Sequence, residues 1–505
     1  MKKLLLPTIL GISVLIWAAI PSIPTAKGTM NDTEHAMSQL LPLLPSSPYN
    51  YSRIRIPQHI GGDSTGFFEY NPPTNTLTDE GATLGRVLFY DTELSINSQV
   101  SCASCHDAAF GFSDSARFSH GINNQLTDRN SIGLANARFQ PLQAFFWSGD
   151  EDTLKHQVKT AITSSKEMGM HLDTLVQRLQ TIGYYPGLFT DAFGDPAITS
   201  DRVFSALGQF VRSFISRNSK FDIAAETNFQ QSGTEAFFFF FPTIDSFPSF
   251  SQSENRGYRL FIQSGCINCH ATGNFVSLFH SNNGLDLVNT DLGLGASTGL
   301  AWDEGKFRAP SLRNIELTGP FMHDGRFNTL EEVIDHYSTG IQNNPNLAPE
   351  LIDSNTGLPR KFNFTQTEKE DLISFLKTLT DTWFLDDPRY EDPFKVGQVR
   401  TIPVSPMSSL LPDDTTVVLS QTPVFTELEA IAFPNPFMDE VSIAFQNEKK
   451  EPYEIRLLNI SGKVIQSKTT RNDMASFSRK DLPKGVYIIQ AKGPSKLKSI
   501  LVEAE

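Results

Sequence analysis

The stretches Cys102-Ala103-Ser104-Cys105-His106 and Cys266-Ile267-Asn268-Cys269-His270 contain every cysteine of this 505-residue chain. The Cys-x-x-Cys-His pattern is the attachment site of a c-type haem. Its two thiols can form thioether bonds with the porphyrin vinyl groups, and the adjacent histidine can bind the iron as proximal ligand. A zinc ribbon or a thioredoxin-like pair also uses Cys-x-x-Cys, but a zinc site would need both pairs to converge and would leave both histidines unexplained. We therefore predict two covalently bound haem c groups.

Length and charge limit the classes of function. A chain of 505 residues is too long for one hydrophobic core, so several domains are expected. The net charge of −14 argues against nucleic acid and anionic membranes as partners. A negative surface would attract a basic electron donor. Alternatively, the negative charge only keeps the protein soluble.

The amino terminus has the pattern of an export signal. Met1-Lys2-Lys3 precedes an apolar run over residues 4–20, and small residues follow up to Ala26. This order predicts a secretory signal peptide over residues 1–26. A retained membrane anchor is the alternative, but the run is short for a span and contains Pro7. Export agrees with c-type haem, which bacteria attach outside the cytoplasm. We expect no stable membrane span after cleavage.

Apolar periodicity predicts a mainly helical body around the two motifs. A helical pattern begins at Thr78 and leads into the first motif, and a similar short helix near Asn255 leads into the second. This recurrence predicts two related haem-binding halves. The apolar faces of the two helices carry Leu84, Val87 and Leu88, and Tyr258, Leu260 and Phe261. Two further stripes comprise Leu172, Leu175, Val176, Leu179 and Ile182, and Val203, Leu207, Phe210, Val211 and Phe214.

Two helix starts near the second motif fit the capping box of Ser or Thr followed three residues later by Glu. They are Thr329 with Glu332 and Thr367 with Glu370. The second box is expected to open a helix that buries Leu372, Phe375, Leu376 and Leu379. The run Phe237–Phe241, with its Ser, Gly and Pro flanks, predicts an insertion that is partly buried against the body.

The carboxy-terminal part changes to a period of two. Val441, Ile443 and Phe445 alternate with polar residues, and a further strand is expected at residues 485–488. Tyr453, Ile455 and Leu457 alternate in the same way, before a turn at Ser461-Gly462. A Pro/Ser/Thr-rich linker precedes this small β-sandwich.

The predicted fold is therefore mainly α, with two cytochrome-c-like haem domains followed by a small C-terminal β-sandwich. The expected segments are a signal peptide (1–26), an N-terminal extension (27–74), the first haem domain (75–250), the second haem domain (251–395), a linker (396–427) and the C-terminal domain (428–505).

The C-terminal domain resembles the sorting domain of type IX (Por) secretion cargo. The similarity is carried by Phe433-Pro434-Asn435-Pro436-Phe437, by residues 457–463 and by Leu482-Pro483-Lys484-Gly485-Val486-Tyr487. In that family the domain directs passage across the outer membrane and is usually removed. The resemblance implies export through the periplasm, followed by secretion or display on the cell surface. A carbohydrate-binding or spacer sandwich is the alternative.

Residues 75–385 resemble the bacterial dihaem cytochrome c peroxidases and their relatives of the MauG type. Beyond the haem motifs, the similarity includes Arg129-Asn130, Trp147, and the stretches 307–314, 317–327 and 329–333. The family implies two haem c groups, hydrogen peroxide as substrate and a small electron-donor protein, either a cytochrome or a cupredoxin.

The spacing of Trp147, Gln157 and Glu167 matches the family's catalytic residues. Glu167 matches the distal glutamate, which can shuttle the proton needed for O–O cleavage, an effect of about 10²–10⁴ in rate. Gln157 matches the glutamine that shapes the distal pocket, and Trp147 the tryptophan between the haems. Taken alone, Glu167 fits better as a solvated loop acid, Gln157 as a helix-surface residue and Trp147 as a core aromatic. The three residues in register together favour the catalytic interpretation.

Asn130, Thr318 and Pro320 match positions that hold a calcium ion between the haem domains in this family. An amide oxygen and two backbone carbonyls are hard ligands that suit Ca²⁺. His323 matches a residue near the second haem, where a structural hydrogen bond is expected instead of iron ligation.

The chain departs from the peroxidase pattern at two places. His120 lies in the region where many peroxidases carry a removable distal histidine ligand, but the matching position is Ile122. His120 is therefore either a displaced ligand or an ordinary loop histidine; we expect the latter, so that the first iron would need no reductive activation. Tyr337 stands where the peroxidases have the methionine ligand of the second haem, as in the MauG type. A phenolate lowers the reduction potential of haem iron and a thioether raises it. Met322 as ligand and Tyr337 as a core aromatic remain alternatives.

The resemblance implies a cytochrome c peroxidase that reduces hydrogen peroxide at the first haem, with electrons arriving through Trp147 and the second haem. A MauG-like oxidase that uses high-valent iron on a protein or organic substrate is the alternative, and Tyr337 favours it. An extracellular dihaem protein that transfers electrons without catalysis is the alternative of another class.

Overall fold

The structure is a computed structural model. It describes residues 41–504, except residues 58, 62–71, 141–144, 233–243, 278, 396–398, 403–404, 412–425, 428–429, 435–436, 448, 460–463, 480–481 and 494–495. The expected signal peptide, the Phe237–Phe241 run and the Ser461-Gly462 turn lie outside the described residues. None of the helices within the described residues is long and apolar enough to cross a membrane.

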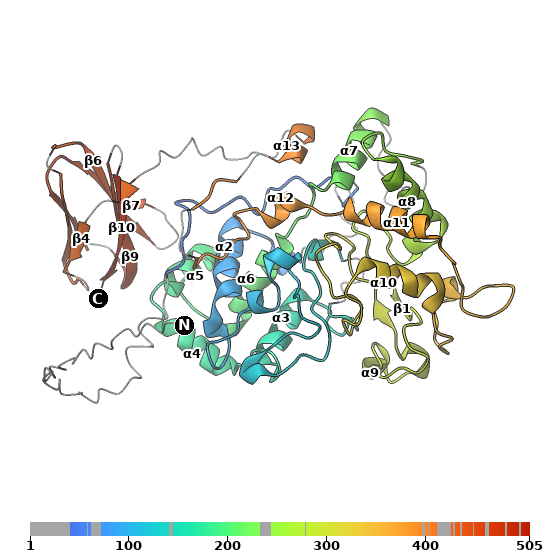
Figure 1. The fold of residues 1–505 in the computed structure, drawn as a ribbon. Helices are drawn as coiled ribbons and strands as arrows, with labels where there is room; N and C mark the ends of the chain where they lie inside the picture. The colour runs from blue at the N-terminus through green and yellow to red at the C-terminus, as the bar shows by residue number, and fades with distance from the viewer. Residues whose placement is uncertain are drawn as a thin grey trace, which may run out of the picture. The chain divides into compact units, whose positions relative to one another are not determined.

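The body is helical, as the apolar periodicity predicts (Figure 1). Its α-helices are α2 (Asp79–Tyr90), α3 (Leu154–Thr163), α4 (Leu172–Thr181), α5 (Tyr185–Phe193), α6 (Ser200–Arg212), α7 (Lys220–Ser232), α8 (Gln252–Gln263), α9 (Gly295–Thr298), α10 (Leu330–Asp335), α11 (Gln366–Lys377), α12 (Thr382–Leu385) and α13 (Pro406–Leu410). A short antiparallel pair, β1 (His280–Ser281) with β2 (Phe307–Arg308), interrupts the helices of the second half.

The helix that leads into the first motif, α2, packs against α6. The Thr78 side chain caps α2 by accepting a hydrogen bond from the Gly81 N–H, and the expected face of Leu84, Val87 and Leu88 is fully buried. The two backbones approach so closely at Gly85 that a Cβ there would lie 2.1 Å from the Ala206 carbonyl oxygen. Only glycine therefore fits this crossing.

The helix that leads into the second motif repeats this arrangement. Helix α8 packs against α11, and a Cβ on Gly257 would lie 1.8 Å from the Asp371 carbonyl oxygen. Arg256, beside this glycine, forms an ion pair with the Asp371 carboxylate at 2.7 Å. In both halves, the helix before a Cys-x-x-Cys-His motif thus crosses a later helix at a glycine, in agreement with the predicted recurrence.

One of the two expected capping boxes is confirmed and the other is displaced. Thr329 and Glu332 form a complete box at the start of α10. Helix α11, however, begins with a box formed by Thr365 and Glu368, so the predicted box of Thr367 with Glu370 is wrong. Both pairs fit the same sequence rule, and the earlier one lengthens the helix by two residues, about half a turn.

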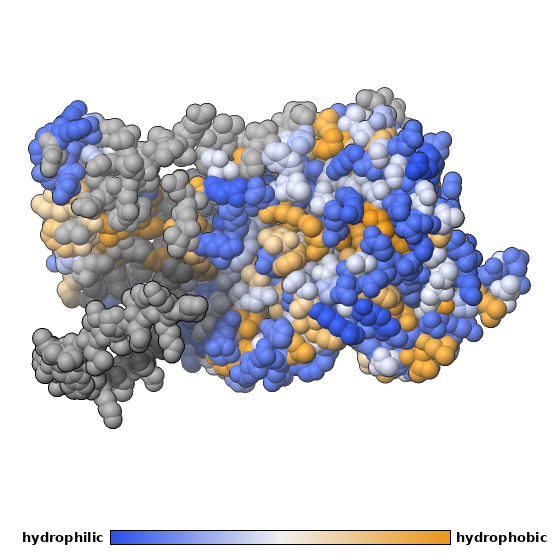
Figure 2. Space-filling view, viewed as in Figure 1, coloured by the Kyte–Doolittle hydropathy of each residue, from blue (hydrophilic) through white to orange (hydrophobic). Residues whose placement is uncertain are grey.

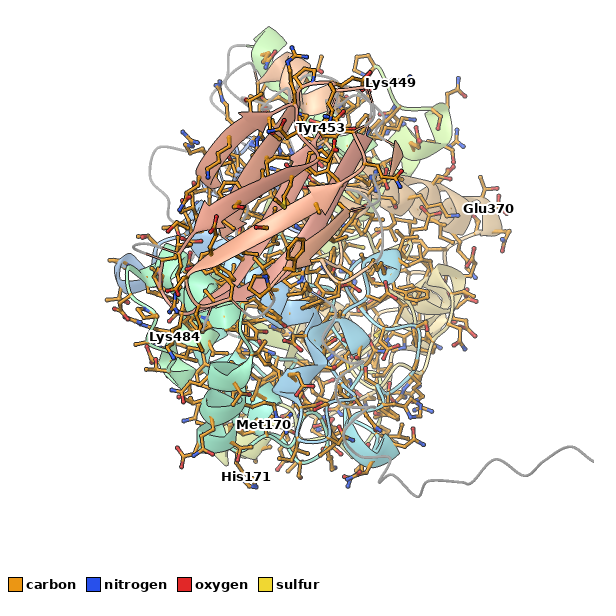
Figure 3. The ribbon with its side chains drawn as sticks, turned by 90° about the vertical axis from the view of Figure 1, so that its left-hand side faces the viewer. Met170, His171, Glu370, Lys449, Tyr453 and Lys484 are labelled. Atoms are coloured by element: carbon orange, nitrogen blue, oxygen red, sulfur yellow. The ribbon has the colours of Figure 1, made fainter. Side chains whose placement is uncertain are left out.

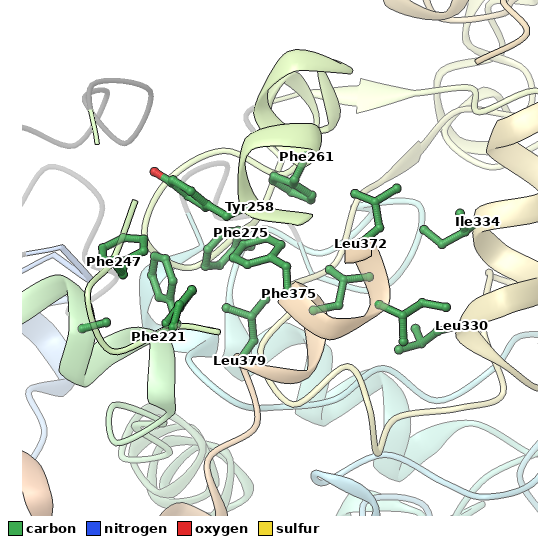
Figure 4. Packing of buried hydrophobic residues seen from close by; sticks show 14 of the residues in the cluster. Phe221, Phe247, Tyr258, Phe261, Phe275, Leu330, Ile334, Leu372, Phe375 and Leu379 are labelled. Atoms are coloured by element: carbon green, nitrogen blue, oxygen red, sulfur yellow. The ribbon is translucent and has the colours of Figure 1, made fainter. Parts of the chain in front are cut away.

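The core of the second half is a cluster of aromatic and aliphatic side chains (Figure 4). The predicted inward-facing residues Leu372, Phe375 and Leu376 of α11 are all buried there, as is Leu379, which follows the helix. Phe375 contacts the rings of Tyr258 and Phe261 from α8, with centroids 5.4 and 5.3 Å apart. This packing fixes α8, and with it the start of the second motif.

The described part of the N-terminal extension packs against the helical body. Within residues 45–61, the Tyr51 hydroxyl donates to the Arg389 carbonyl oxygen at 2.9 Å, and Tyr49 donates to the Arg400 carbonyl at the same distance. His59 is buried, with its Nε2 atom 2.7 Å from the Asp222 carboxylate. The extension therefore contacts residues more than 300 positions away.

Part of the predicted linker also has a defined place. Helix α13 lies within residues 396–427, and Met407 and Leu411 are buried. The Gln230 side chain from α7 donates to the Leu410 carbonyl oxygen at 2.7 Å. This short helix thus belongs with the helical body.

The C-terminal domain consists of two sheets, as predicted. The strands are β3 (Thr426–Glu427), β4 (Ala430–Phe433), β5 (Glu440–Phe445), β6 (Tyr453–Asn459), β7 (Val464–Thr470), β8 (Met474–Ser478), β9 (Gly485–Lys492) and β10 (Lys496–Ala504). One sheet has the order β3-β10-β9-β6-β7 and the other β4-β5-β8 (Figure 3, which labels Tyr453 on β6). Val441, Ile443 and Phe445 pack inward against Ile455, Leu457 and Ile489.

Candidate functional site

Each Cys-x-x-Cys-His motif lines its own cavity. Cys102, Cys105 and His106 line the first cavity. Cys266, Cys269 and His270 line the second. The four cysteines are free thiols. Because the two cysteine pairs do not share a cavity, the arrangement favours two separate cofactors over one shared zinc ion.

The two motifs fold identically. In the first, the Cys105 and His106 amides both donate to the Cys102 carbonyl oxygen, at 3.2 and 3.0 Å. In the second, the Cys269 and His270 amides donate to the Cys266 carbonyl at the same two distances. Such a tight turn brings the two thiols and the imidazole of each motif to one side of the chain.

A backbone carbonyl orients each motif histidine. The Nδ1 atom of His106 lies 2.9 Å from the Phe112 carbonyl oxygen, and Nδ1 of His270 lies 3.3 Å from the Phe275 carbonyl oxygen. A carbonyl only accepts hydrogen bonds, so Nδ1 carries the proton and Nε2 keeps its lone pair. Phe112 and Phe275 have φ of 60° and 53°, an unusual conformation for a bulky residue. The sequence does not predict that these two backbone carbonyls orient the histidines.

Burial keeps these histidines neutral and these thiols protonated. It lowers the pKa of His106 and brings the pKa of His270 down to about 4. Burial also raises the pKa of Cys102 and of Cys266 to about 12. A neutral imidazole with a free Nε2 lone pair beside two thiols is the donor set that a c-type haem requires.

Glu167 and Gln157 line the first cavity together with the first motif. Glu167 lies in the turn after α3, where its amide donates to the Ser164 carbonyl at 3.1 Å and its carbonyl accepts from the Ile122 amide at 2.8 Å. A Cβ on Gly121 would lie 1.9 Å from the Lys166 carbonyl oxygen, so the neighbouring loop presses against this turn. Glu167 is thereby held by backbone contacts on two sides.

The Glu167 carboxyl group is poised near neutral pH. Burial raises its pKa from 4.5 to about 7, and the negative charge of Asp128 acts in the same direction. A carboxyl group that titrates near pH 7 can both accept and donate a proton under ordinary conditions. This is the property that a proton shuttle needs.

Trp147 lines both cavities. Its indole Nε1–H donates to the Asn130 carbonyl oxygen at 2.8 Å, and its own carbonyl accepts from the Arg308 amide at 3.0 Å. Residues from both halves of the chain therefore hold the tryptophan in the wall between the cavities.

His323 and Arg308 share this wall region. The His323 ring stacks on Phe307 at 4.0 Å and contacts Trp147 edge-on at 6.4 Å, so aromatic packing fixes the orientation of this ring. Arg308 lines both cavities and is buried, and its Nε atom donates to the Phe146 carbonyl at 2.6 Å. A buried guanidinium facing two cavities suits ligands that carry carboxylates.

Tyr337 and Met322 both line the second cavity. Tyr337 lies in a one-turn π-helix, His336–Gly340, directly after α10. The Asn283 amide nitrogen lies 3.5 Å from the Met322 sulfur, and the Asn283 carbonyl accepts from His336 Nε2 at 3.1 Å. Burial raises the pKa of Tyr337 to about 12, although a hydrogen bond with the Asn283 side chain lowers it. Asn283, which sequence reasoning missed, thus contacts both candidate ligands.

Asn130, Thr318 and Pro320 line the second cavity together. The Asn130 amide nitrogen donates to the Ala116 and Arg117 carbonyl oxygens at 3.3 and 3.2 Å. These contacts use the nitrogen of the amide and leave the Oδ1 atom for another partner.

His120 lies outside this group. Its side chain is exposed, and its Nδ1 atom lies 2.7 Å from the Asn124 side-chain oxygen. It does not line the first cavity, which agrees with an ordinary loop histidine. Ile122 is buried.

Two family models match the chain. The model of di-haem cytochrome c peroxidase matches residues 79–230. The model of the secretion system C-terminal sorting domain matches residues 431–503.

Individual proteins are similar over most of their length. The chain is 31% identical to the methylamine utilization protein MauG of Methylorubrum extorquens, over 74% of this chain and 95% of that protein. It is 30% identical to the cytochrome c551 peroxidase of Nitrosomonas europaea, over 64% of this chain and 86% of that protein. The crystal structure of a MauG-like protein associated with microbial copper homeostasis matches with a TM-score of 0.54 at 32% identity, covering 65% of this chain and 97% of that chain.

Proposed function

Because this chain belongs to the family of di-haem cytochrome c peroxidases and MauG proteins, we propose that it reduces hydrogen peroxide to water with electrons from a small redox protein. The donor is a cytochrome c or a cupredoxin. The observation that carries this proposal is the placement of Glu167, with a pKa of about 7, in the cavity of the first motif.

The residues of both cavities fit a covalently bound haem c. Cys102 with Cys105, and Cys266 with Cys269, would form the thioether bonds, and His106 and His270 would ligate the two irons. Residues 75–250 and 251–395 would form the two haem domains. A haem at the first motif supplies the iron centre at which peroxide binds and its O–O bond breaks.

Glu167 supplies the proton transfer. As a carboxylate it accepts a proton from the inner peroxide oxygen, and it then donates that proton to the outer oxygen, which leaves as water. The reduction consumes two electrons and two further protons for each peroxide, and it yields two water molecules. Gln157, on the same cavity wall, orients the peroxide through its side-chain amide.

Trp147 supplies the path between the cavities. Its indole lies in the wall that the two cavities share, so an electron from the second cavity can cross through an aromatic side chain instead of saturated bonds. The hydrogen bond to the Asn130 carbonyl fixes the plane of the ring.

The decisive experiment adds hydrogen peroxide to the reduced, haem-loaded protein. Oxidation of the protein with multiple turnovers in the presence of a reduced cytochrome supports the peroxidase, and the Glu167→Gln variant should lose that turnover. Absence of oxidation by peroxide, with an unaltered Glu167→Gln variant, would leave only a non-catalytic electron-transfer protein.

A MauG-like oxidase acting on a protein or organic substrate is the second candidate, and Tyr337 favours it. Tyr337 faces the second motif from a π-turn, a local geometry that often marks functional sites. A tyrosine ligand would give the second haem a low reduction potential, whereas Met322 as ligand would give a high one. A strongly negative measured potential would support the oxidase, and a high potential would support the peroxidase.

A calcium ion between the two halves is a further part of the proposal. The Asn130 Oδ1 atom and the carbonyl oxygens of Thr318 and Pro320 would hold it, with water completing the shell. Removal of calcium with a chelator should slow electron transfer between the haems, and added Ca²⁺ should restore it. No response to either treatment would argue against the site.

The sorting domain implies export through the type IX machinery. We propose that residues 1–26 act as a cleaved signal peptide and that the protein crosses the periplasm before secretion or surface attachment. Mass spectrometry of the mature protein, which should begin after residue 26 and carry two haems, tests this route.

A further inference from the structure

We propose that residues 285–305 form the docking surface for a small, basic redox protein that exchanges electrons with the two cavities. This inference rests on the proposed function and extends it by locating the partner and stating its chemistry. Four observations carry it: exposed apolar side chains, a polar internal scaffold, access to both cavities, and an excess of carboxylates.

The segment exposes large apolar side chains to an unusual degree. Leu287, Val288, Leu292, Leu300 and Trp302 have exposed fractions of 57, 74, 41, 39 and 62%. Figure 2 shows apolar atoms gathered over the loops around α9, which this segment contains. Several large apolar side chains exposed on one segment are typical of an interaction site.

Buried and half-buried side-chain amides hold the segment together, so the exposed apolar side chains are not needed for this. The Asn289 Oδ1 atom accepts from Asn344 at 2.7 Å and from Asn282 at 3.2 Å. The Asn346 side chain donates to the Ala301 and Glu304 carbonyl oxygens at 2.7 and 3.0 Å. The loop is thus fixed by polar bonds inside, and its apolar side chains are left for an external partner.

The same stretch of chain reaches both cavities. Thr290, Asp291, Leu292 and Ala296 line the first cavity. Ser281, Asn282 and Asn283, directly before the segment, line the second. A protein bound here would therefore lie next to the walls of both cavities, where electron transfer is fast because the distance is short.

Charge indicates which kind of partner fits. The segment contains Asp286, Asp291, Asp303 and Glu304 and no lysine or arginine, in a chain of net charge −14. Asp291 pairs with Arg129, Asp286 with Arg326 and Asp303 with Lys306, so the local field is moderate. The overall negative charge would steer a basic partner, and apolar contact would provide most of the affinity. An apolar patch surrounded by lysines is the matching surface.

The test uses the haem-loaded full chain with the double substitution Val288→Ser and Trp302→Ser. Neither residue lines either of the two cavities that contain the Cys-x-x-Cys-His motifs. The probe is a reduced, basic mitochondrial-type cytochrome c, used in peroxide turnover and in direct binding by calorimetry. Loss of a central aromatic anchor should raise both KM and Kd for this probe by about tenfold or more. Turnover with a small organic electron donor should stay unchanged.

The control is Leu358→Ser, which removes a similarly exposed leucine, 56% accessible, from the loop at residues 353–358. It should leave KM and Kd for the cytochrome unaltered. Unchanged binding in the double variant, or equal losses in the control, would overturn the docking surface. A change of oligomeric state in the double variant would also overturn it, because a second copy would then occupy the surface. If the wild type turns over with neither donor, the proposed function fails, while the binding measurement still decides the surface.

Discussion

Replacing Glu167 by Gln should have opposite effects on activity and stability. The amide has nearly the same shape as the carboxyl group but cannot take up a proton from peroxide. The rate of peroxide reduction should therefore fall by about 10²–10⁴, the usual contribution of a positioned acid–base group. In the wild type, this rate should rise with pH around 7, where the Glu167 carboxylate forms. In the variant, that step in the pH profile should disappear.

The stability effect follows from the raised pKa. In the unfolded chain Glu167 ionises near 4.5, whereas burial delays ionisation in the folded chain to about pH 7. Between these values the folded state binds more protons, so the free energy of unfolding decreases as pH rises. At about 1.4 kcal/mol for each pH unit, the ionised carboxylate costs the folded protein at most about 3.5 kcal/mol above pH 7. The Gln variant is free of this cost and should be the more stable protein at pH 8.

Stopped-flow reaction with peroxide from pH 5 to 9 measures the first effect, and denaturant unfolding at pH 4 and pH 8 measures the second. The wild type and the variant should have equal stability at pH 4, and the variant should unfold at higher denaturant concentration at pH 8. A variant that keeps wild-type rates across the pH range would refute the role of Glu167. Equal stability at both pH values would refute the burial of its charge.

Tyr337→Met should raise the reduction potential of the second haem by at least about 0.1 V in a redox titration followed by absorbance, because a thioether replaces a phenolate; an unchanged potential would exclude Tyr337 as ligand. Trp147→Phe should slow electron transfer between the haems after peroxide is mixed with the half-reduced protein, and unaltered kinetics would remove the indole from the path. Gly257→Ala should lower the Tm, at a cost of about 1–3 kcal/mol or more, because its Cβ would lie 1.8 Å from the Asp371 carbonyl oxygen. Gly208→Ala is the matched control, since the nearest atom to its Cβ is 3.8 Å away and alanine favours the helix. Deletion of residues 428–505 should retain an active protein in the periplasm, and cell fractionation with a peroxidase assay would show whether it is still secreted.

Local signals in the sequence predicted the helices, the strands and the haem motifs. The Thr329–Glu332 box and the apolar face of α2 needed only residues within one or two turns of each other. The displaced start of α11 shows the limit of such signals, because two overlapping Thr-x-x-Glu pairs fit one rule. Propensity cannot choose between them, while the packing of the whole helix can.

The features that the sequence did not predict depend on contacts between distant residues or on backbone conformation. The loops that follow the motifs set the positive φ of Phe112 and Phe275. Phenylalanine rarely adopts this conformation, so the residue type does not predict it. Asn283 contacts Met322 and His336 only because two loops meet at the second cavity. The proposed catalytic residues Trp147, Gln157 and Glu167 could be predicted from their spacing, which resembles that of the family, whereas a single residue such as Glu167 gives no such signal.

The strap formed by residues 45–61 has a consequence for how the protein matures. It is made early during synthesis, yet its partners Asp222, Arg389 and Arg400 follow far behind it. In the proposed export from the amino end, the contacts of the strap with Arg389 and Arg400 cannot form until almost the entire helical body has emerged. Both Cys-x-x-Cys-His motifs precede these two arginines in the chain, so they emerge before the strap is complete, which would leave their thiols accessible for the proposed haem attachment.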